Sequence, residues 1–157
     1  MGKTPNPEIV KFLTLLCETD QTMEIRILGT RHGTVAGYYQ NNFDKLASDV
    51  WEWNGLAPAV YITLNPVNPA LLSRSANHLK EYSKLATADA DIVKRRWLPI
   101  DFDPVRPAGI SSTDEEHQLA LDRAIEADQW LRTECEFPEG IYADSGNGAH
   151  LLYRIDK

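Results

Sequence analysis

The stretch WLPIDFDPVRPAGISSTDEEH, residues 97–117, most constrains what this chain can fold into. Its first part is an apolar run with strand-forming residues, and it ends in two acids, Asp101 and Asp103. Its last part is a strong helix start, because Thr113 and Glu116 have the spacing of a capping box. A strand therefore leads through a loop with prolines and a glycine into a helix, so the chain combines both kinds of element.

The rest of the chain alternates between helical and strand patterns. Apolar residues at helical spacing predict helices over 6–18, 41–55 and 112–134, with one or two short helices over 70–92. Alternating or β-branched stretches predict strands over 23–30, 33–39, 59–65, 95–103, 140–144 and 149–155. We expect an α+β fold in which one mixed sheet is flanked by helices, formed by residues 1–157 as one domain.

The strand over 95–103 carries two conflicting signals. Its apolar run favours a central strand that is covered on both faces. Pro99 favours an edge position or a bulge, because proline has no N–H to give to a neighbouring strand.

Charge and cysteine content limit the class of protein. The net charge is −7, which argues against a surface that is basic all over and grips nucleic acid everywhere. The dense basic cluster Lys94–Arg96 is either a local basic patch or a solvated strand entrance. Two distant cysteines predict reduced thiols, as in a cytoplasmic protein. No apolar run is long enough to cross a bilayer and no leader pattern occurs, so we expect no membrane partner.

The two acids at the end of the strand predict a metal site. Side chains alternate along a strand, so Asp101 and Asp103 share one face while Phe102 points to the other. Neighbouring carboxylates repel each other, and a divalent cation relieves that repulsion. Mg²⁺ and Mn²⁺ prefer carboxylate oxygens, and Mg²⁺ often combines one or two of them with phosphates. The alternative is a pair of solvated turn residues, with Asp103 opening a turn before Pro104.

A second motif, DSGNGAHLLYR at 144–154, predicts a phosphate contact. Its turn offers backbone amides that can cradle an anion, together with two polar side chains; these residues are Ser145, Gly146, Asn147 and Gly148. His150 opens the following strand and shares a face with Arg154. The alternatives are an ordinary hairpin turn and a structural histidine.

Together the two motifs resemble the archaeo-eukaryotic primase superfamily. The closest likeness is to the bifunctional primase–polymerase domains of phages, plasmids and bacterial mobile elements. That family has a hydrophobic-Asp-hydrophobic-Asp motif, here 100–103, and a small-x-His motif at the start of a later strand, here 148–150. The stretches GYY and VYITLNPV also look like that subgroup, so the resemblance runs from about residue 23 onward.

The resemblance implies nucleotidyl transfer from nucleoside triphosphates, for primer synthesis and extension in DNA replication. Asp101 and Asp103 would be catalytic ligands of Mg²⁺ or Mn²⁺, and His150 would contact the triphosphate. The partners would be a single-stranded DNA template and a fused or associated helicase. Arg96 and Arg106 are candidates for phosphate or template contacts, and Arg106 is equally suited to a local pair with Asp103 or Asp114.

The chain departs from the family pattern at its end. The family's third acidic motif lies on a strand well after the histidine, whereas here Asp156 follows His150 closely. We therefore expect the N-terminal part of a longer primase–polymerase. Two other classes stay open: a nucleotide- or single-stranded-DNA-binding module without chemistry, and a metal-dependent phosphodiesterase or nuclease. The last would need further ligands near the dyad, and three other histidines show no link to it: His32, His78 and His117.

Overall fold

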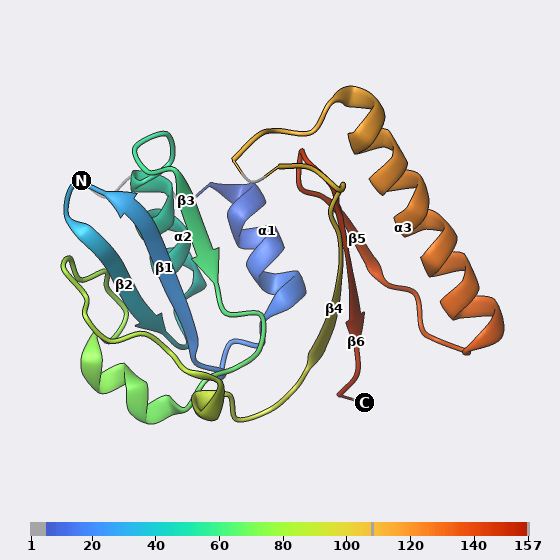
Figure 1. The fold of residues 1–157 in the computed structure, drawn as a ribbon. Coiled ribbons are helices and arrows are strands. Elements are labelled where there is room, and N and C mark those ends of the chain that lie inside the picture. Colours follow the sequence, from blue (N-terminus) through green and yellow to red (C-terminus); the bar gives the residue numbers. More distant parts are fainter. Residues whose placement is uncertain (1–5, 108, 157) are drawn as a thin grey trace. The chain divides into compact units, whose positions relative to one another are not determined.

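The computed structural model describes residues 6–107 and 109–156 (Figure 1). Along the sequence the chain divides into two compact units between Arg95 and Arg96. Each unit holds one three-stranded sheet, and all pairs of named strands are antiparallel. The α+β class is therefore confirmed, but the prediction of one mixed sheet is wrong. Short hairpins can only join antiparallel strands, and the long segment between β3 and β4 contains no crossover helix that would return the chain to the first sheet.

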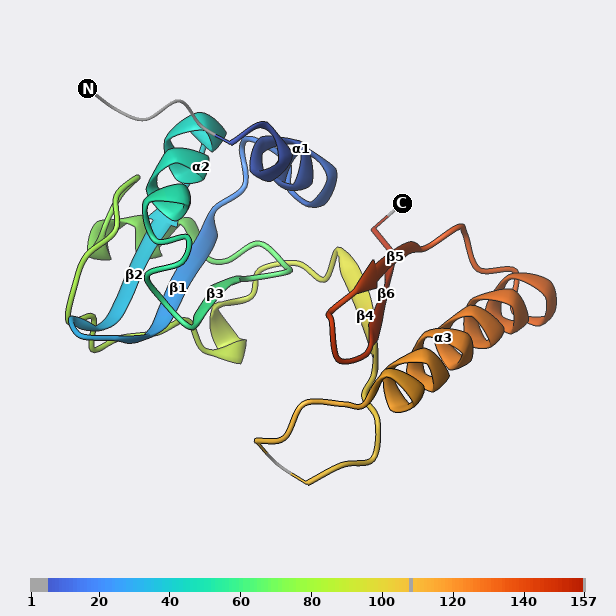
Figure 2. The ribbon, with the colours of Figure 1, turned by 90° about the horizontal axis from the view of Figure 1, so that it is seen from above.

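The first unit is a sheet covered on one face by two helices. The sheet has the order β2-β1-β3 and consists of β1 (Met23–Thr30), β2 (Gly33–Tyr39) and β3 (Ala59–Ile62). Helices α1 (Pro7–Leu16) and α2 (Phe43–Glu52) lie on the same side of it (Figure 2). Their apolar faces meet those of the strands in a buried core, made of Leu13, Ile25, Ile27, Val35, Tyr39, Leu46 and Ala47. The predicted helices and strands of this half are confirmed.

The segment after β3 contains the short helices expected there, as two 3₁₀ helices, η1 (Pro69–Arg74) and η2 (Asp89–Asp91). Between them the chain returns to the outer edge of β2. It forms isolated bridges there, Ala36 with Lys80 and Tyr38 with Ala76. The edge strand β2 is thereby partly paired.

The second unit is a sheet of order β4-β6-β5 with one long helix. Its strands are β4 (Trp97–Phe102), β5 (Ile141–Asp144) and β6 (Ala149–Arg154), and its helix is α3 (Asp114–Glu134). Helix α3 packs on one face of this sheet through Ala124, against Ala149, Leu151 and Tyr153. β4 is an edge strand, so the edge position predicted from Pro99 is confirmed and the central position predicted from the apolar run is wrong.

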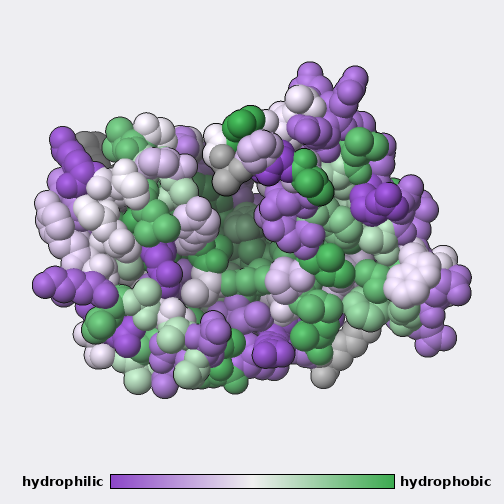
Figure 3. Space-filling model, in the orientation of Figure 1, coloured by the Kyte–Doolittle hydropathy of each residue, from purple (hydrophilic) through white to green (hydrophobic). Residues whose placement is uncertain are grey.

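The outer surface of α3 is mainly hydrophilic, with single hydrophobic side chains between the polar ones (Figure 3). The exposed large hydrophobic residues of α3 include Leu119 and Trp130. Within the described part of the chain, no helix has the length and apolar character that crossing a membrane requires.

Candidate functional site

The acid motif and the histidine motif meet in the second unit. Asp101 on β4 is the register partner of His150 on β6, and the carboxylate Oδ1 lies 3.1 Å from the imidazole Nε2. Their strand neighbours Phe102 and Ala149 pack towards α3, so Asp101 and His150 lie on the opposite, open face of the sheet. Both side chains are about half exposed, at 59% and 46%. They are thus paired with each other and still accessible to a ligand.

Asp103 lies beside this pair. The last register pair is Phe102 with Ala149, which places Asp103 next to Gly148 at the end of the two strands. A Cβ atom on Gly148 would overlap the Phe102 carbonyl oxygen and lie 3.4 Å from the Asp103 Oδ1. The absence of a side chain at position 148 therefore permits the close approach of the two strand ends that brings the second acid to the site.

Arg106 belongs to the loop after β4 and contacts the second acid. Its Nη2 lies 3.9 Å from the Asp103 Oδ1, and its Nη1 donates to the Ile110 carbonyl at 2.6 Å. Of the contacts predicted for Arg106, the structure contains the local ion pair with Asp103. A cation thus stands near the dyad and partly compensates its charge.

The glycine turn is held by its own side chains. The Gly146 N–H donates to the Asp144 Oδ1 at 2.7 Å, and the Gly148 N–H donates to the Ser145 Oγ at 3.0 Å. The Asn147 Oδ1 accepts from the N–H and Oγ of Ser112, at 3.0 and 3.2 Å. These donors and acceptors fix the turn and tie it to the segment before α3. An anion would have to compete for both amides, so the predicted amide cradle remains a prediction.

Arg96 lies away from the acid dyad. It directly precedes the first residue of β4, five residues before Asp101, which is about 17 Å along a strand. Its side chain is buried, with Nε 3.9 Å from the Asp156 Oδ2, and the Asp156 Oδ1 accepts from the Arg154 Nε at 2.9 Å. The structure therefore does not bring Arg96 or Asp156 to the Asp101–His150 pair.

One further acid–histidine pair was not found from the sequence. His117 in the second turn of α3 places its Nε2 2.8 Å from the Asp144 Oδ1 at the end of β5. The Gly146 N–H is the main cause of a lowered Asp144 pKa, and the hydrogen bond from His117 adds to it. No local pattern links the two residues, because only the packing of α3 on the sheet brings them together.

A groove of about 530 Å³ lies on the α3 side of the edge strand β4, between the end of β4, the following loop and α3; Asp101 and Asp103 are among its lining residues, and His150 is not. Its walls include Val105, Leu119 and Arg123. This volume is within the range of small-molecule sites.

The donor set at the dyad fits a magnesium or manganese ion. Asp101 and Asp103 are exposed carboxylates, and Mg²⁺ commonly takes one or two carboxylates together with substrate phosphates and water. Over residues 6–107 and 109–156, no group of three or more His, Cys, Asp or Glu side chains could hold a metal ion. A metal held here would therefore depend on phosphates and water for its remaining ligands.

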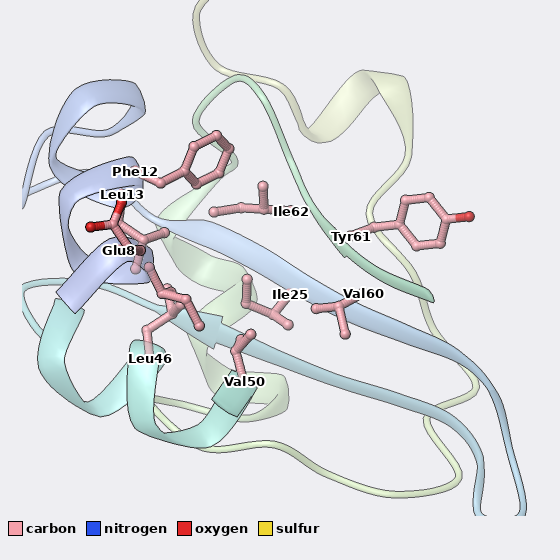
Figure 4. Close-up of a pocket in the computed structure, with 10 residues that line it drawn as sticks. Glu8, Phe12, Leu13, Ile25, Leu46, Val50, Val60, Tyr61 and Ile62 are labelled. Carbon is pink, nitrogen blue, oxygen red and sulfur yellow. The ribbon is translucent and has the colours of Figure 1, made fainter. Parts of the chain in front are cut away.

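The first unit contains an apolar cavity of about 330 Å³ between α1, α2 and β3. Figure 4 shows Phe12 and Ile62 pointing towards each other across it, while Tyr61 points away on the other side of the strand. Glu8 is the one charged residue on its wall. The cavity offers apolar contact and no group arranged for chemistry.

No protein-family model, curated protein or solved structure matches this chain.

Proposed function

We propose that this chain belongs to a primase–polymerase catalytic domain, which transfers nucleotides from nucleoside triphosphates during primer synthesis and extension. The observation that carries the proposal is the pairing of Asp101 with His150, with Asp103 beside them on adjoining strand ends. These are the residues of the two motifs that resemble the archaeo-eukaryotic primase superfamily.

The acids and the histidine have separate roles in this proposal. Asp101 and Asp103 hold Mg²⁺ or Mn²⁺, which when bound would neutralise phosphate charge and lower the pKa of the attacking hydroxyl. His150 binds the triphosphate as a hydrogen-bond donor. Asp101 orients the imidazole through Nε2, which leaves Nδ1 for another partner. Arg106 lies close enough to Asp103 to offset part of the negative charge when the metal is absent.

The partners follow from the same proposal. The substrates are nucleoside triphosphates, and the template is single-stranded DNA. A fused or associated helicase would supply that single strand, as in the families that the chain resembles.

An alternative is a nucleotide- or single-stranded-DNA-binding module of the same fold that performs no chemistry. One observation favours this alternative: among the described residues, no third acid is grouped with Asp101, Asp103 and His150 to hold a metal ion. The nuclease hypothesis has less support, because His117 pairs with Asp144 and His32 pairs with Glu81 in the first unit.

Calorimetric titration of the chain with a deoxynucleoside triphosphate tests the proposal, first with Mn²⁺ and then with EDTA. We expect binding with the metal and none with EDTA. Binding that is equal in both conditions would contradict the metal assignment. Primer extension with the same nucleotide then separates the enzyme from the binding module.

A further inference from the structure

A basic pocket lies in the first unit, apart from the acid dyad. It has a volume of about 430 Å³, and its walls carry three cations, Arg74, Lys80 and Lys84, and no carboxylate. The chain as a whole has a net charge of −7, so such a concentration of positive charge is unusual for it. A cavity lined by one sign of charge concentrates ligands of the opposite sign.

The main chain of this pocket is fixed on the sheet. Lys80 and Ala36 exchange two backbone hydrogen bonds, at 2.9 and 3.0 Å. The Tyr82 N–H donates to the His32 carbonyl at 3.0 Å, and the Ser83 N–H donates to the Thr34 carbonyl at 2.8 Å. The segment therefore lies along β2 much like an extra strand, and the pocket is preformed.

The three cationic side chains differ in how firmly their neighbours hold them. Arg74 lies over the Tyr38 ring, with its Cζ 5.9 Å from the centroid, and donates to the Tyr38 hydroxyl at 3.2 Å. Lys80 and Lys84 are exposed, and neither forms an ion pair with a carboxylate in the described part of the chain. Arg74 thus gives one fixed charge, and the two lysines give two charges that are free to meet an anion.

The serine hydroxyls of the pocket contribute little to anion recognition. Ser73, Ser75 and Ser83 each donate to a backbone carbonyl, those of Ala70, His78 and Leu85 respectively. A phosphate in the pocket would therefore be bound through the cations.

Tyr82 adds an aromatic surface next to the lysines. Tyr82 is 63% exposed, its ring meets that of His32 edge-on at a centroid distance of 6.1 Å, and Gly33 lies beside it. Proteins that bind single-stranded nucleic acid combine a basic groove for the backbone with an exposed aromatic side chain for a base. Inorganic phosphate alone would use the cations and leave Tyr82 without a role.

The geometry points to a site for single-stranded nucleic acid, with phosphates held by Arg74, Lys80 and Lys84 and a base stacked on Tyr82. The inference rests on the proposed function in one respect only, which is that the ligand of the pocket is a nucleic acid. It requires neither the metal nor Asp101 and Asp103, so the two can be tested separately.

The experiment measures fluorescence anisotropy of a labelled thymidine oligonucleotide in EDTA at several salt concentrations. For Lys80→Gln with Lys84→Gln, we expect roughly tenfold weaker binding and a salt slope reduced by about 1.4, since each phosphate contact on a single strand contributes about 0.7. Tyr82→Ala should weaken binding by roughly tenfold, and Tyr82→Phe should retain it, because stacking needs only the ring. The control, Lys11→Gln with Lys45→Gln, removes the same charge from α1 and α2 and should leave the affinity nearly unchanged.

Three results would overturn the inference: no binding of the oligonucleotide to the unaltered chain, equal losses in the pocket and control variants, or full affinity in Tyr82→Ala. In the first case, binding of inorganic phosphate by a chain that does not bind the oligonucleotide would identify the pocket as a site for small anions. Far-UV circular dichroism verifies that each variant is folded. Asp103→Ala should keep its oligonucleotide affinity in EDTA, so a failure of the metal site and a failure of this pocket give different results.

Discussion

Asp101 and His150 face each other across two neighbouring antiparallel strands, with the carboxylate Oδ1 3.1 Å from the imidazole Nε2. Both side chains are about half exposed, and exposed ion pairs stabilise a fold by only about 0–1 kcal/mol. The fold therefore does not depend on this pair. Substitutions in it should affect ligand binding much more than stability, which makes the site testable.

Asp103→Ala should remove metal-dependent nucleotide binding and leave the fold intact. The Asp103 side chain is 62% exposed, so its loss should change the free energy of unfolding by no more than about 0.5 kcal/mol. Manganese-supported affinity, measured by calorimetry, should fall by at least roughly tenfold, because one of two carboxylate ligands is gone. Asp122→Ala on the exposed side of α3 is the matched control. An unchanged affinity in Asp103→Ala would contradict the metal assignment.

His150→Ala should weaken the binding of a nucleoside triphosphate more than that of the monophosphate. The imidazole is the proposed donor to the outer phosphates, and a monophosphate lacks these. Calorimetry with both ligands on both proteins gives the comparison, with His78→Ala as a control on an exposed histidine of the first unit. Equal losses for the two ligands would mean that His150 does not touch the β- or γ-phosphate.

Local signals in the sequence were enough to predict most helices and strands. The capping box of Thr113 and Glu116 is present, and α3 begins at the next residue, Asp114. Alternation likewise predicted that Asp101 and Asp103 share a face; in the structure Asp103 follows the last residue of β4 and lies beside Gly148. These features depend on residues a few positions apart, which a sequence displays directly.

Features that depend on distant residues were not predictable in the same way. Which strands pair is decided by packing between remote segments, so one sheet was expected where two exist. Arg96 was a candidate for a phosphate or template contact, yet its side chain is buried and lies near Asp156. The pair of His117 with Asp144 likewise needs the docking of α3 on the sheet before it exists.

Gly148→Ala should destabilise the second unit. The new methyl group would overlap the Phe102 carbonyl oxygen, which belongs to a neighbouring strand and cannot move freely. Forced overpacking of this kind costs about 1–3 kcal/mol. Gly146→Ala is the control, since nothing lies within 4 Å of its added Cβ and only its positive φ of 79° opposes the change, at about 1 kcal/mol. Urea unfolding measures the free energy of unfolding of both variants. A larger loss of this free energy in Gly146→Ala than in Gly148→Ala would show that the close approach of the strands at position 148 does not exclude a side chain there.

Asp144→Asn should lose a stabilisation that depends on pH. The Gly146 N–H first and His117 second lower the pKa of the Asp144 carboxyl below its usual value. A carboxylate with a lowered folded-state pKa stabilises the fold above its unfolded-state pKa, near 4, and this contribution disappears as the pH falls through the folded-state value. The unaltered chain should therefore exceed Asp144→Asn in unfolding free energy at about pH 5, and the difference should shrink towards about pH 2.

Urea unfolding at several pH values between these limits provides the measurement. Asp122→Asn, an exposed acid on α3, shows how much of any trend is general to surface carboxylates. A difference between the unaltered chain and Asp144→Asn that stays constant over the whole range would contradict the ionic role of Asp144.

Tyr153→Phe should reveal a stabilisation that is lost at high pH. The Tyr153 ring is fully buried against Phe137, at a centroid distance of 5.1 Å, and its hydroxyl donates to the Asp128 Oδ1 at 2.8 Å. Burial first, and then the bond to Asp128, raise the pKa of Tyr153 to about 12. The neutral phenol therefore stabilises the fold fully below the unfolded-state pKa, near 10, and this contribution declines as the pH rises to about 12.

Phenylalanine keeps the ring in the core and removes only the hydroxyl. At about pH 8 the loss of this hydrogen bond should lower the free energy of unfolding by about 1–2 kcal/mol. The difference should then narrow between pH 10 and 12, because only the unaltered chain has a phenol at position 153 that ionises on unfolding. Urea unfolding followed by circular dichroism at several pH values measures it, with Tyr61→Phe, an exposed tyrosine of β3, as the control. A difference that remains constant from pH 8 to about pH 12 would mean that the Tyr153–Asp128 bond contributes nothing to the pH dependence of stability.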